Sequence, residues 1–174
     1  MGGYGAVRIA MKRPDVFSGL YILSACCLMN NPGAQAQGNR GAGNRGGGFG
    51  NVTFAEGAAW SPNPNNPPNY FDVPVKDGVV QPLIAAKWIA NSPLAMIDQY
   101  VGNLKKLKAI AGDVGTADGL MASNKQMEEA FTNFGVNHTF ETYEGDHTNK
   151  IGERIEMKVF PFFSQNLNFV IPKK

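Results

Sequence analysis

Two side chains capable of acid–base chemistry follow runs that read as strands. Asp118 comes after the apolar run 107–111, and His147 comes after the run 138–143. A carboxylate that holds a histidine in one tautomer makes its other ring nitrogen a general base, which can take the proton of a serine hydroxyl. The two residues therefore predict two of the three side chains that nucleophilic acyl transfer by a serine requires.

The start of the chain indicates where the third side chain belongs. Met1-Gly2-Gly3-Tyr4-Gly5-Ala6 is similar to the second half of a G-x-S-x-G turn, beginning with the residue after the serine. The chain's own serines stand in no such context; they are Ser18, Ser24, Ser61, Ser92, Ser123 and Ser164. We therefore expect the nucleophile serine to be absent from these 174 residues.

Other ionisable side chains lie close by in the sequence. Asp113 is a rival for the acid role, and it stands where the strand is expected to end. Asp146 is typical of a turn or capping residue and would orient the loop that carries His147. His138 stands at the start of a strand, where we expect it to be structural or solvated.

The elements that must position these residues alternate along the chain. Apolar, aromatic and β-branched runs predict strands at 19–24, 107–111 and 138–143. Apolar periodicity and capping signals predict helices at 1–12, 83–89, 93–104, 120–134 and 151–167. This order is typical of an α/β fold with a mostly parallel sheet of about three strands and helices on both faces. Chemistry in such sheets lies beyond the carboxyl ends of the strands, so Asp118 and His147 should share one rim.

Four segments resemble the esterase family of α/β-hydrolases that includes S-formylglutathione hydrolases (esterase D), feruloyl esterases and acetyl-xylan esterases. They are Met1–Ala6, Gly112–Asp118, Gly145–Thr148 and Phe160–Phe163. The resemblance implies a partial α/β-hydrolase domain over 1–174, matching the C-terminal part of the family's domain.

The same resemblance assigns roles to single residues. The chain order in the family is serine, acid, histidine. His147 would be the general base, and the acid would lie in the loop, which favours Asp118 over Asp113. A serine would immediately precede the position matched by Met1, whose backbone N–H would be one oxyanion donor.

Residues 31–80 are rich in glycine, proline and asparagine, and we expect an irregular or lid-like insertion there. The Arg40–Phe49 stretch resembles an RGG tract, but two arginines are too few for nucleic-acid binding. Four aromatic side chains could line an acyl or aromatic pocket, or could each pack in a core: Trp60, Tyr70, Phe71 and Trp88.

Composition restricts the remaining function classes. The net charge of +2 is too small to indicate a polyanionic partner, and no apolar run approaches the length of a membrane span. The adjacent Cys26 and Cys27 have no metal-ligand spacing and are expected to be free thiols. We expect no metal or organic cofactor, and a small-molecule or carbohydrate-linked ester as substrate. Localisation stays open, because any export signal would precede Met1.

Two hypotheses remain. In the first, the chain is part of a serine carboxylesterase and is inactive alone; the strand 19–24 would lack a neighbour, so its open apolar edge predicts self-association. In the second, the chain is a non-catalytic binding or assembly module that reuses hydrolase elements. A module of that kind should fold as a stable monomer.

Overall fold

A three-stranded parallel sheet organises the first of two compact units in the computed structural model, which describes residues 1–30 and 52–167. This unit comprises Met1–Cys26 and Ile97–Lys174. The strand order is β1-β4-β5, and the strands are β1 (Gly19–Leu23), β4 (Ala109–Gly115) and β5 (Thr139–Tyr143). Because all three strands run parallel, their carboxyl ends meet at the same edge of the sheet.

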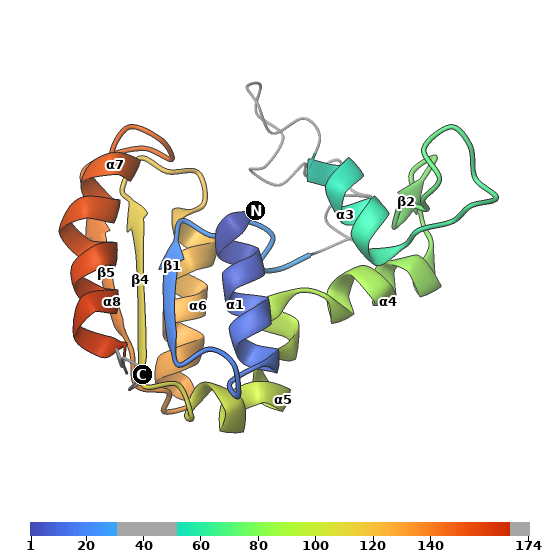
Figure 1. Ribbon diagram of the computed structural model, residues 1–174. Coiled ribbons are helices and arrows are strands. Elements are labelled where there is room, and N and C mark those ends of the chain that lie inside the picture. Colours follow the sequence, from blue (N-terminus) through green and yellow to red (C-terminus); the bar gives the residue numbers. More distant parts are fainter. Residues whose placement is uncertain (31–51, 168–174) are drawn as a thin grey trace, which may run out of the picture. The chain divides into compact units, whose positions relative to one another are not determined.

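Helices cover both faces of this sheet, as Figure 1 shows. One face carries α1 (Gly2–Lys12) and α6 (Met121–Asn133). The other carries a continuous helical stretch made of α7 (Ile151–Arg154), the π-helical turn η2 (Ile155–Val159) and α8 (Phe160–Asn166). The α/β class and the helix-covered parallel sheet expected from the sequence are therefore confirmed.

Alternation along β1 divides its side chains between the two faces. Leu20 and Ile22 are buried, and Ile22 lies beside Met127 of α6. Tyr21 points to the opposite face, where its ring meets that of Phe162 edge-on at 5.3 Å between centroids. The core of this unit therefore has two layers, one on each side of the sheet.

Among the glycines at the start of the chain, Gly3 is the one that lies in close contact with the end of β1. A Cβ at this position would lie 2.8 Å from Cα of Ala25 and 2.9 Å from the carbonyl oxygen of Leu23. Only a residue without a side chain lets α1 cross so close to the end of β1. The first turn of α1 is thereby held against the rim where β1 ends.

The second compact unit spans Cys27–Met96. Its elements are α3 (Val52–Trp60), the hairpin strands β2 (Val75–Lys76) and β3 (Val79–Val80), and α4 (Pro82–Ala90). Trp60 and Trp88 are buried against each other edge-on, 5.4 Å between centroids. The helix α5 (Pro93–Leu104) begins in this unit and continues into the first.

The expectation of irregular backbone at 31–80 was wrong at residues 52–60 and 75–80. Residues 52–60 form a helix, and residues 75–80 form a hairpin whose turn residues Asp77 and Gly78 have φ values of 52° and 76°. The helix forms because tertiary packing outweighs composition: Gly57 lies directly against the ring of Phe71. Residues 31–51, including the Arg40–Phe49 stretch, lie outside the described residues. The single partial domain over 1–174 stays a prediction.

The boundary of β4 corrects a second expectation. The strand was expected to end near Ala111, but it continues to Gly115, so Asp113 lies inside the strand and is completely buried. A carboxylate is compatible with a buried strand here because Arg154 neutralises it. Among the described residues, no helix combines the length and the apolar character that crossing a membrane requires.

Candidate active site

Asp118 and His147 meet beyond the carboxyl ends of β4 and β5. The distance between Asp118 Oδ2 and His147 Nδ1 is 2.9 Å. The Asp118 side chain is 2% exposed and that of His147 is 29% exposed, so the acid is covered and the imidazole reaches the surface. The sequence predicted that the two residues would share one rim, and the structure brings them into hydrogen-bond contact.

The geometry fixes the tautomer of the neutral histidine. An ionised carboxylate can only accept hydrogen bonds, so Nδ1 of His147 carries the proton and Nε2 is left as the basic nitrogen. The other oxygen of Asp118, Oδ1, accepts the backbone N–H of Leu120 at 2.9 Å, which orients the carboxylate. This arrangement is the one in which a histidine can act as a general base through Nε2.

Backbone contacts join the loops that carry the acid and the histidine. The N–H of Thr116 donates to the carbonyl of Tyr143 at 2.8 Å, and the N–H of Ala117 donates to that of Gly145 at 2.9 Å. Gly115 permits this approach, because a Cβ there would lie 2.8 Å from the carbonyl carbon of Gly145. The relative position of the loops is therefore set by main chain as well as by side chains.

Asp146 organises the turn that presents His147. Its Oδ1 accepts the backbone N–H groups of Thr148 and Asn149 at 2.7 and 2.9 Å. These two hydrogen bonds stabilise the carboxylate and lower the pKa of Asp146 below its ordinary value. The residue has the turn geometry expected from the sequence.

Asp113, the rival acid, has a different partner. Its Oδ2 accepts hydrogen bonds from the Arg154 guanidinium at 2.7 and 2.9 Å and from the Tyr21 hydroxyl at 2.8 Å. Burial is the main cause that raises the pKa of Tyr21, and the hydrogen bond to Asp113 raises it further. The structure therefore brings Asp118, and not Asp113, into contact with His147.

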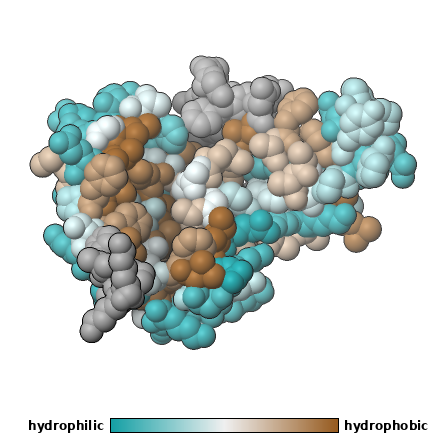
Figure 2. All heavy atoms as spheres, in the orientation of Figure 1, coloured by the Kyte–Doolittle hydropathy of each residue, from teal (hydrophilic) through white to brown (hydrophobic). Residues whose placement is uncertain are grey.

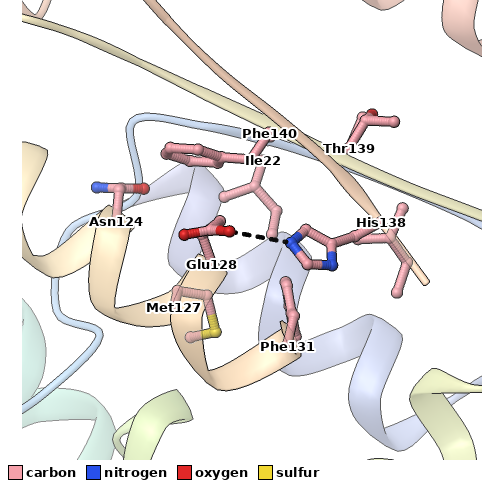
Figure 3. A pocket seen from close by; sticks show the side chains of 11 residues that line it. Ile22, Asn124, Met127, Glu128, Phe131, His138, Thr139 and Phe140 are labelled. Carbon is pink, nitrogen blue, oxygen red and sulfur yellow. Dashed lines mark ion pairs between the residues drawn. The ribbon is translucent and has the colours of Figure 1, made fainter. Parts of the chain in front are cut away.

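The second histidine, His138, lies between β5 and α6. Its Nδ1 is 2.9 Å from the carbonyl oxygen of Val136, and its Nε2 is 3.9 Å from Glu128 Oε1. Figure 3 shows the imidazole beside Phe131, with Glu128 across from it on α6. The side chain is 11% exposed, which agrees with a structural histidine rather than a solvated one.

Met1 lies at the amino-terminal end of α1, and its carbonyl oxygen accepts the N–H of Gly5 at 3.0 Å. Its sulfur lies 3.3 Å from Sγ of Cys26. Cys26 is buried and Cys27 is partly exposed, and the two do not form a disulfide. The oxyanion role of the Met1 backbone N–H stays a prediction.

Three of the chain's serines use their hydroxyl groups to bind backbone carbonyls. Ser61 donates to Asp72, Ser92 to Trp88 and Ser123 to Leu120, at distances of 2.6, 3.1 and 2.9 Å. These contacts are typical of serines that stabilise loops and helices. Within residues 1–30 and 52–167, no three His, Cys, Asp or Glu side chains gather as a metal ion would require.

The four candidate pocket aromatics separate into two groups. Trp60, Phe71 and Trp88 are buried, and Trp88 donates its ring N–H to Ser61 at 2.8 Å. Tyr70 is exposed, with a φ of 58°. The structure therefore favours packing for the three buried rings.

The sequence did not predict the roles that two residues of this region have in positioning the site. Gly115 can be recognised only once its distance to Gly145 is known, although it lies in a segment that resembles the esterase family. Arg154 was not expected, because its partner Asp113 is 41 residues away and no local pattern joins the two.

Comparison with known proteins finds similarity in structure but no match in sequence. No family model matches the chain, and no curated protein matches it in sequence. One similar solved structure is a ferulic acid esterase, with a TM-score of 0.58 and 20% identity over 96% of this chain. Another is an S-formylglutathione hydrolase from Staphylococcus aureus, with a TM-score of 0.52 and 17% identity over 93% of this chain.

The chain spans about half the length of both structures, 49% of the first and 47% of the second. At these identities the likeness concerns the fold. The three-stranded parallel sheet with helices on both faces is therefore an α/β fold shared with part of two hydrolases, a ferulic acid esterase and an S-formylglutathione hydrolase.

Proposed function

We propose that the chain supplies the acid and the base of a serine carboxylesterase. The observation that carries the proposal is the 2.9 Å contact between the buried Asp118 carboxylate and Nδ1 of His147 at the carboxyl edge of a parallel sheet. The likeness to two hydrolases of related fold agrees with it. The nucleophile is a serine that is not among the six in the chain.

The reaction is hydrolysis of a carboxylic ester through an acyl-enzyme. His147 Nε2 takes the proton of the serine hydroxyl as the oxygen attacks the ester carbonyl, and it returns the proton to the leaving alcohol. Water then attacks the acyl-enzyme by the same exchange, releasing the acid and restoring the serine. Asp118 keeps His147 in the required tautomer and stabilises the imidazolium that forms in each step.

The start of the chain contributes to oxyanion binding in this proposal. The serine would immediately precede Met1, and the backbone N–H of Met1 would donate to the developing oxyanion. The close crossing of α1 over the end of β1, which Gly3 allows, supports placing this backbone at the rim. Substrates are small-molecule or carbohydrate-linked esters, and no metal or organic cofactor takes part.

An ester-cleavage assay tests the proposal in two forms of the protein. The 174-residue chain should hydrolyse p-nitrophenyl acetate no faster with His147 than with His147→Gln. Any His147-dependent turnover by this chain would contradict the proposal that these residues lack the nucleophile.

The second form is the longer product of the same reading frame. It should contain Gly-x-Ser directly before Met1 and should be labelled by a fluorophosphonate at that serine. His147→Gln should abolish its turnover, whereas His138→Gln should not. An in-frame upstream sequence without such a serine contradicts the proposal.

The open edge of β1 supports a proposal about partners. β1 pairs with β4 alone among the described strands, which leaves its second edge without a strand there. Val16 and Phe17, which precede β1, are exposed, and Figure 2 shows apolar side chains gathered on the side of the sheet that β1 borders. An exposed apolar edge is a template for strand pairing, so we propose that this chain self-associates through it.

Sedimentation velocity tests this association. The 174-residue chain should sediment as species larger than a monomer, and a Val16→Lys/Phe17→Lys variant should shift toward the monomer. A compact wild-type monomer that unfolds cooperatively would instead support the non-catalytic module.

A further inference from the structure

The Arg154 guanidinium lies in a charge network on the face of the sheet that α7 covers. It donates two hydrogen bonds to Asp113 of β4 and a third to Glu141 of β5. Asp113 and Glu141 are register partners on adjacent strands, so one guanidinium joins two strands to the helix. The Asp113 side chain is completely buried and that of Arg154 is 9% exposed.

Arg154 also contacts the end of the strand that leads to His147. Its guanidinium carbon lies 4.7 Å from the centre of the Tyr143 ring, at cation–π distance. Tyr143 ends β5, and Arg154 ends α7. The loop 144–150, which carries His147, begins directly after Tyr143 and ends where α7 begins.

Two ion pairs therefore tie the same two segments of the chain together. Asp113 and Asp118 lie five positions apart at the end of β4 and in the loop that follows. Arg154 and His147 lie seven positions apart across the loop and α7. The Asp113–Arg154 pair is buried, and both Nε and Nη2 of Arg154 donate to the one oxygen Oδ2 of Asp113, whereas the Asp118–His147 pair is partly exposed.

We propose that Arg154, through Asp113, is a positioning residue that holds His147 in hydrogen-bond contact with Asp118. This inference rests on the proposed function, because it assigns Arg154 a role in the same site. The planar guanidinium places two N–H groups on Asp113 Oδ2 and one on Glu141 Oε1, and these three hydrogen bonds fix its orientation, which a single flexible contact does not. Without this guanidinium, α7 loses the hydrogen bonds that join Arg154 to β4.

The chain offers a direct readout, because it contains only two histidines. In the neutral state each imidazole carries its proton on Nδ1, since the partners are Asp118 and the carbonyl oxygen of Val136. The exchange of each Nδ1 proton with water can be measured by NMR of the full chain labelled with ¹⁵N-histidine. His138 then serves as an internal reference in the same spectrum.

Two variants and one control separate a positioning role from loss of folding. Arg154→Lys keeps the positive charge beside buried Asp113 but loses the planar two-armed donor. The double variant Arg154→Met/Asp113→Asn removes both charges, so neither is left buried and unpaired. The matched control is Arg13→Met/Asp15→Asn, which removes an exposed Arg–Asp pair whose closest N–O distance is also 2.7 Å.

We expect exchange of the His147 Nδ1 proton to accelerate by about tenfold or more in the double variant and by about threefold in Arg154→Lys, because local opening becomes more frequent. His138 should remain unchanged in both variants, and both histidines should remain unchanged in the control. Wild-type exchange at His147 in Arg154→Lys and in the folded double variant would overturn the inference. If the double variant does not unfold cooperatively, Arg154→Lys alone decides.

A wild-type chain without a protected Nδ1 proton on His147 gives a different result. In that case the Asp118–His147 pair itself is absent, and the proposed function fails together with this inference. A protected proton that persists in every variant overturns the role of Arg154 alone and leaves the proposed function standing.

Discussion

His147 and His138 both face a carboxylate, yet they have different environments. The Nδ1 of His147 lies 2.9 Å from a carboxylate that is 2% exposed. The Nε2 of His138 lies 3.9 Å from Glu128, which is 34% exposed, while its Nδ1 faces a backbone carbonyl. The first histidine stands beyond the carboxyl end of its strand and the second at the amino end of the same strand.

The difference teaches that proximity of a histidine and a carboxylate is weak evidence for chemistry. A covered acid on Nδ1 leaves Nε2 as the basic nitrogen at the rim, where ligands of parallel sheets bind. In His138, by contrast, Nδ1 faces a backbone carbonyl and Nε2 lies 3.9 Å from a partly exposed carboxylate, which is typical of a histidine packed in the structure. Four variants or pairs of variants test this contrast.

The largest effect is expected from the two carboxylates. In the form of the protein that carries the nucleophile, Asp118→Asn should lower kcat by about 10⁴-fold, because an amide donor favours the wrong tautomer of His147. Glu128→Gln should leave kcat within about twofold, as surface substitutions do. Ester turnover measures both, and equal losses in the two variants would remove the contrast.

The contact between the two loops comes next. Gly115→Ala should cost about 2 kcal/mol of unfolding free energy, because the new Cβ overlaps the Gly145 backbone. Gly119→Ala is the matched control, since no atom lies within 4 Å of a Cβ at that site, and it should change stability by less than about 1 kcal/mol. Urea unfolding of both variants decides the matter, and a Gly115→Ala chain as stable as wild type would show that the loops can separate freely.

The stability that Asp146 gives to the turn presenting His147 should be lost at acidic pH. Folding lowers the pKa of Asp146 below its ordinary value of 3.8, so its charge stabilises the fold above that value. This contribution is lost as the pH falls through the lower pKa of the folded state. Wild type should therefore be more stable than Asp146→Asn at pH 7, and the difference should disappear under strongly acidic conditions. Urea midpoints measured across this range test the prediction, which a pH-independent difference would contradict.

The smallest effect on stability is expected from removing the carboxylate that faces His138. Glu128→Gln should change the unfolding free energy by less than about 0.5 kcal/mol, because a partly exposed carboxylate 3.9 Å from its partner contributes little. Urea unfolding at low and high salt should give the same small difference. A loss of several kcal/mol would mean that this pair is a structural link comparable to the buried Asp113–Arg154 pair.

Much of the fold follows from local sequence signals. The Ser92-Pro93 cap predicted the start of α5 to the residue, and Gly135, with a φ of 61°, ends α6 as a glycine after a helix does. The helix α3 was missed because it lies in a glycine- and proline-rich region. Its burial against Phe71 depends on contacts that a composition window does not contain.

The candidate site was predictable to a similar degree. Asp118 and His147 could be paired from their places after strands, because parallel strands end at one rim. The rival, Asp113, could not be resolved from sequence alone, since its role depends on Arg154, which approaches from a distant helix. Interactions between segments far apart in the chain thus separate the two acids.

The π-helical turn η2 has a consequence for helical phase. Arg154 and Phe162 are eight positions apart, which in an uninterrupted α-helix turns them about 80° away from each other, at about 100° per residue. One extra residue accommodated in a π-turn reduces this angle to about 20°. Both side chains can then face the sheet, Arg154 toward Asp113 and Phe162 toward Tyr21. Deleting one residue from η2 would therefore leave seven positions between the two anchors, which in a regular α-helix turns them only about 20° apart, so both would still face the sheet.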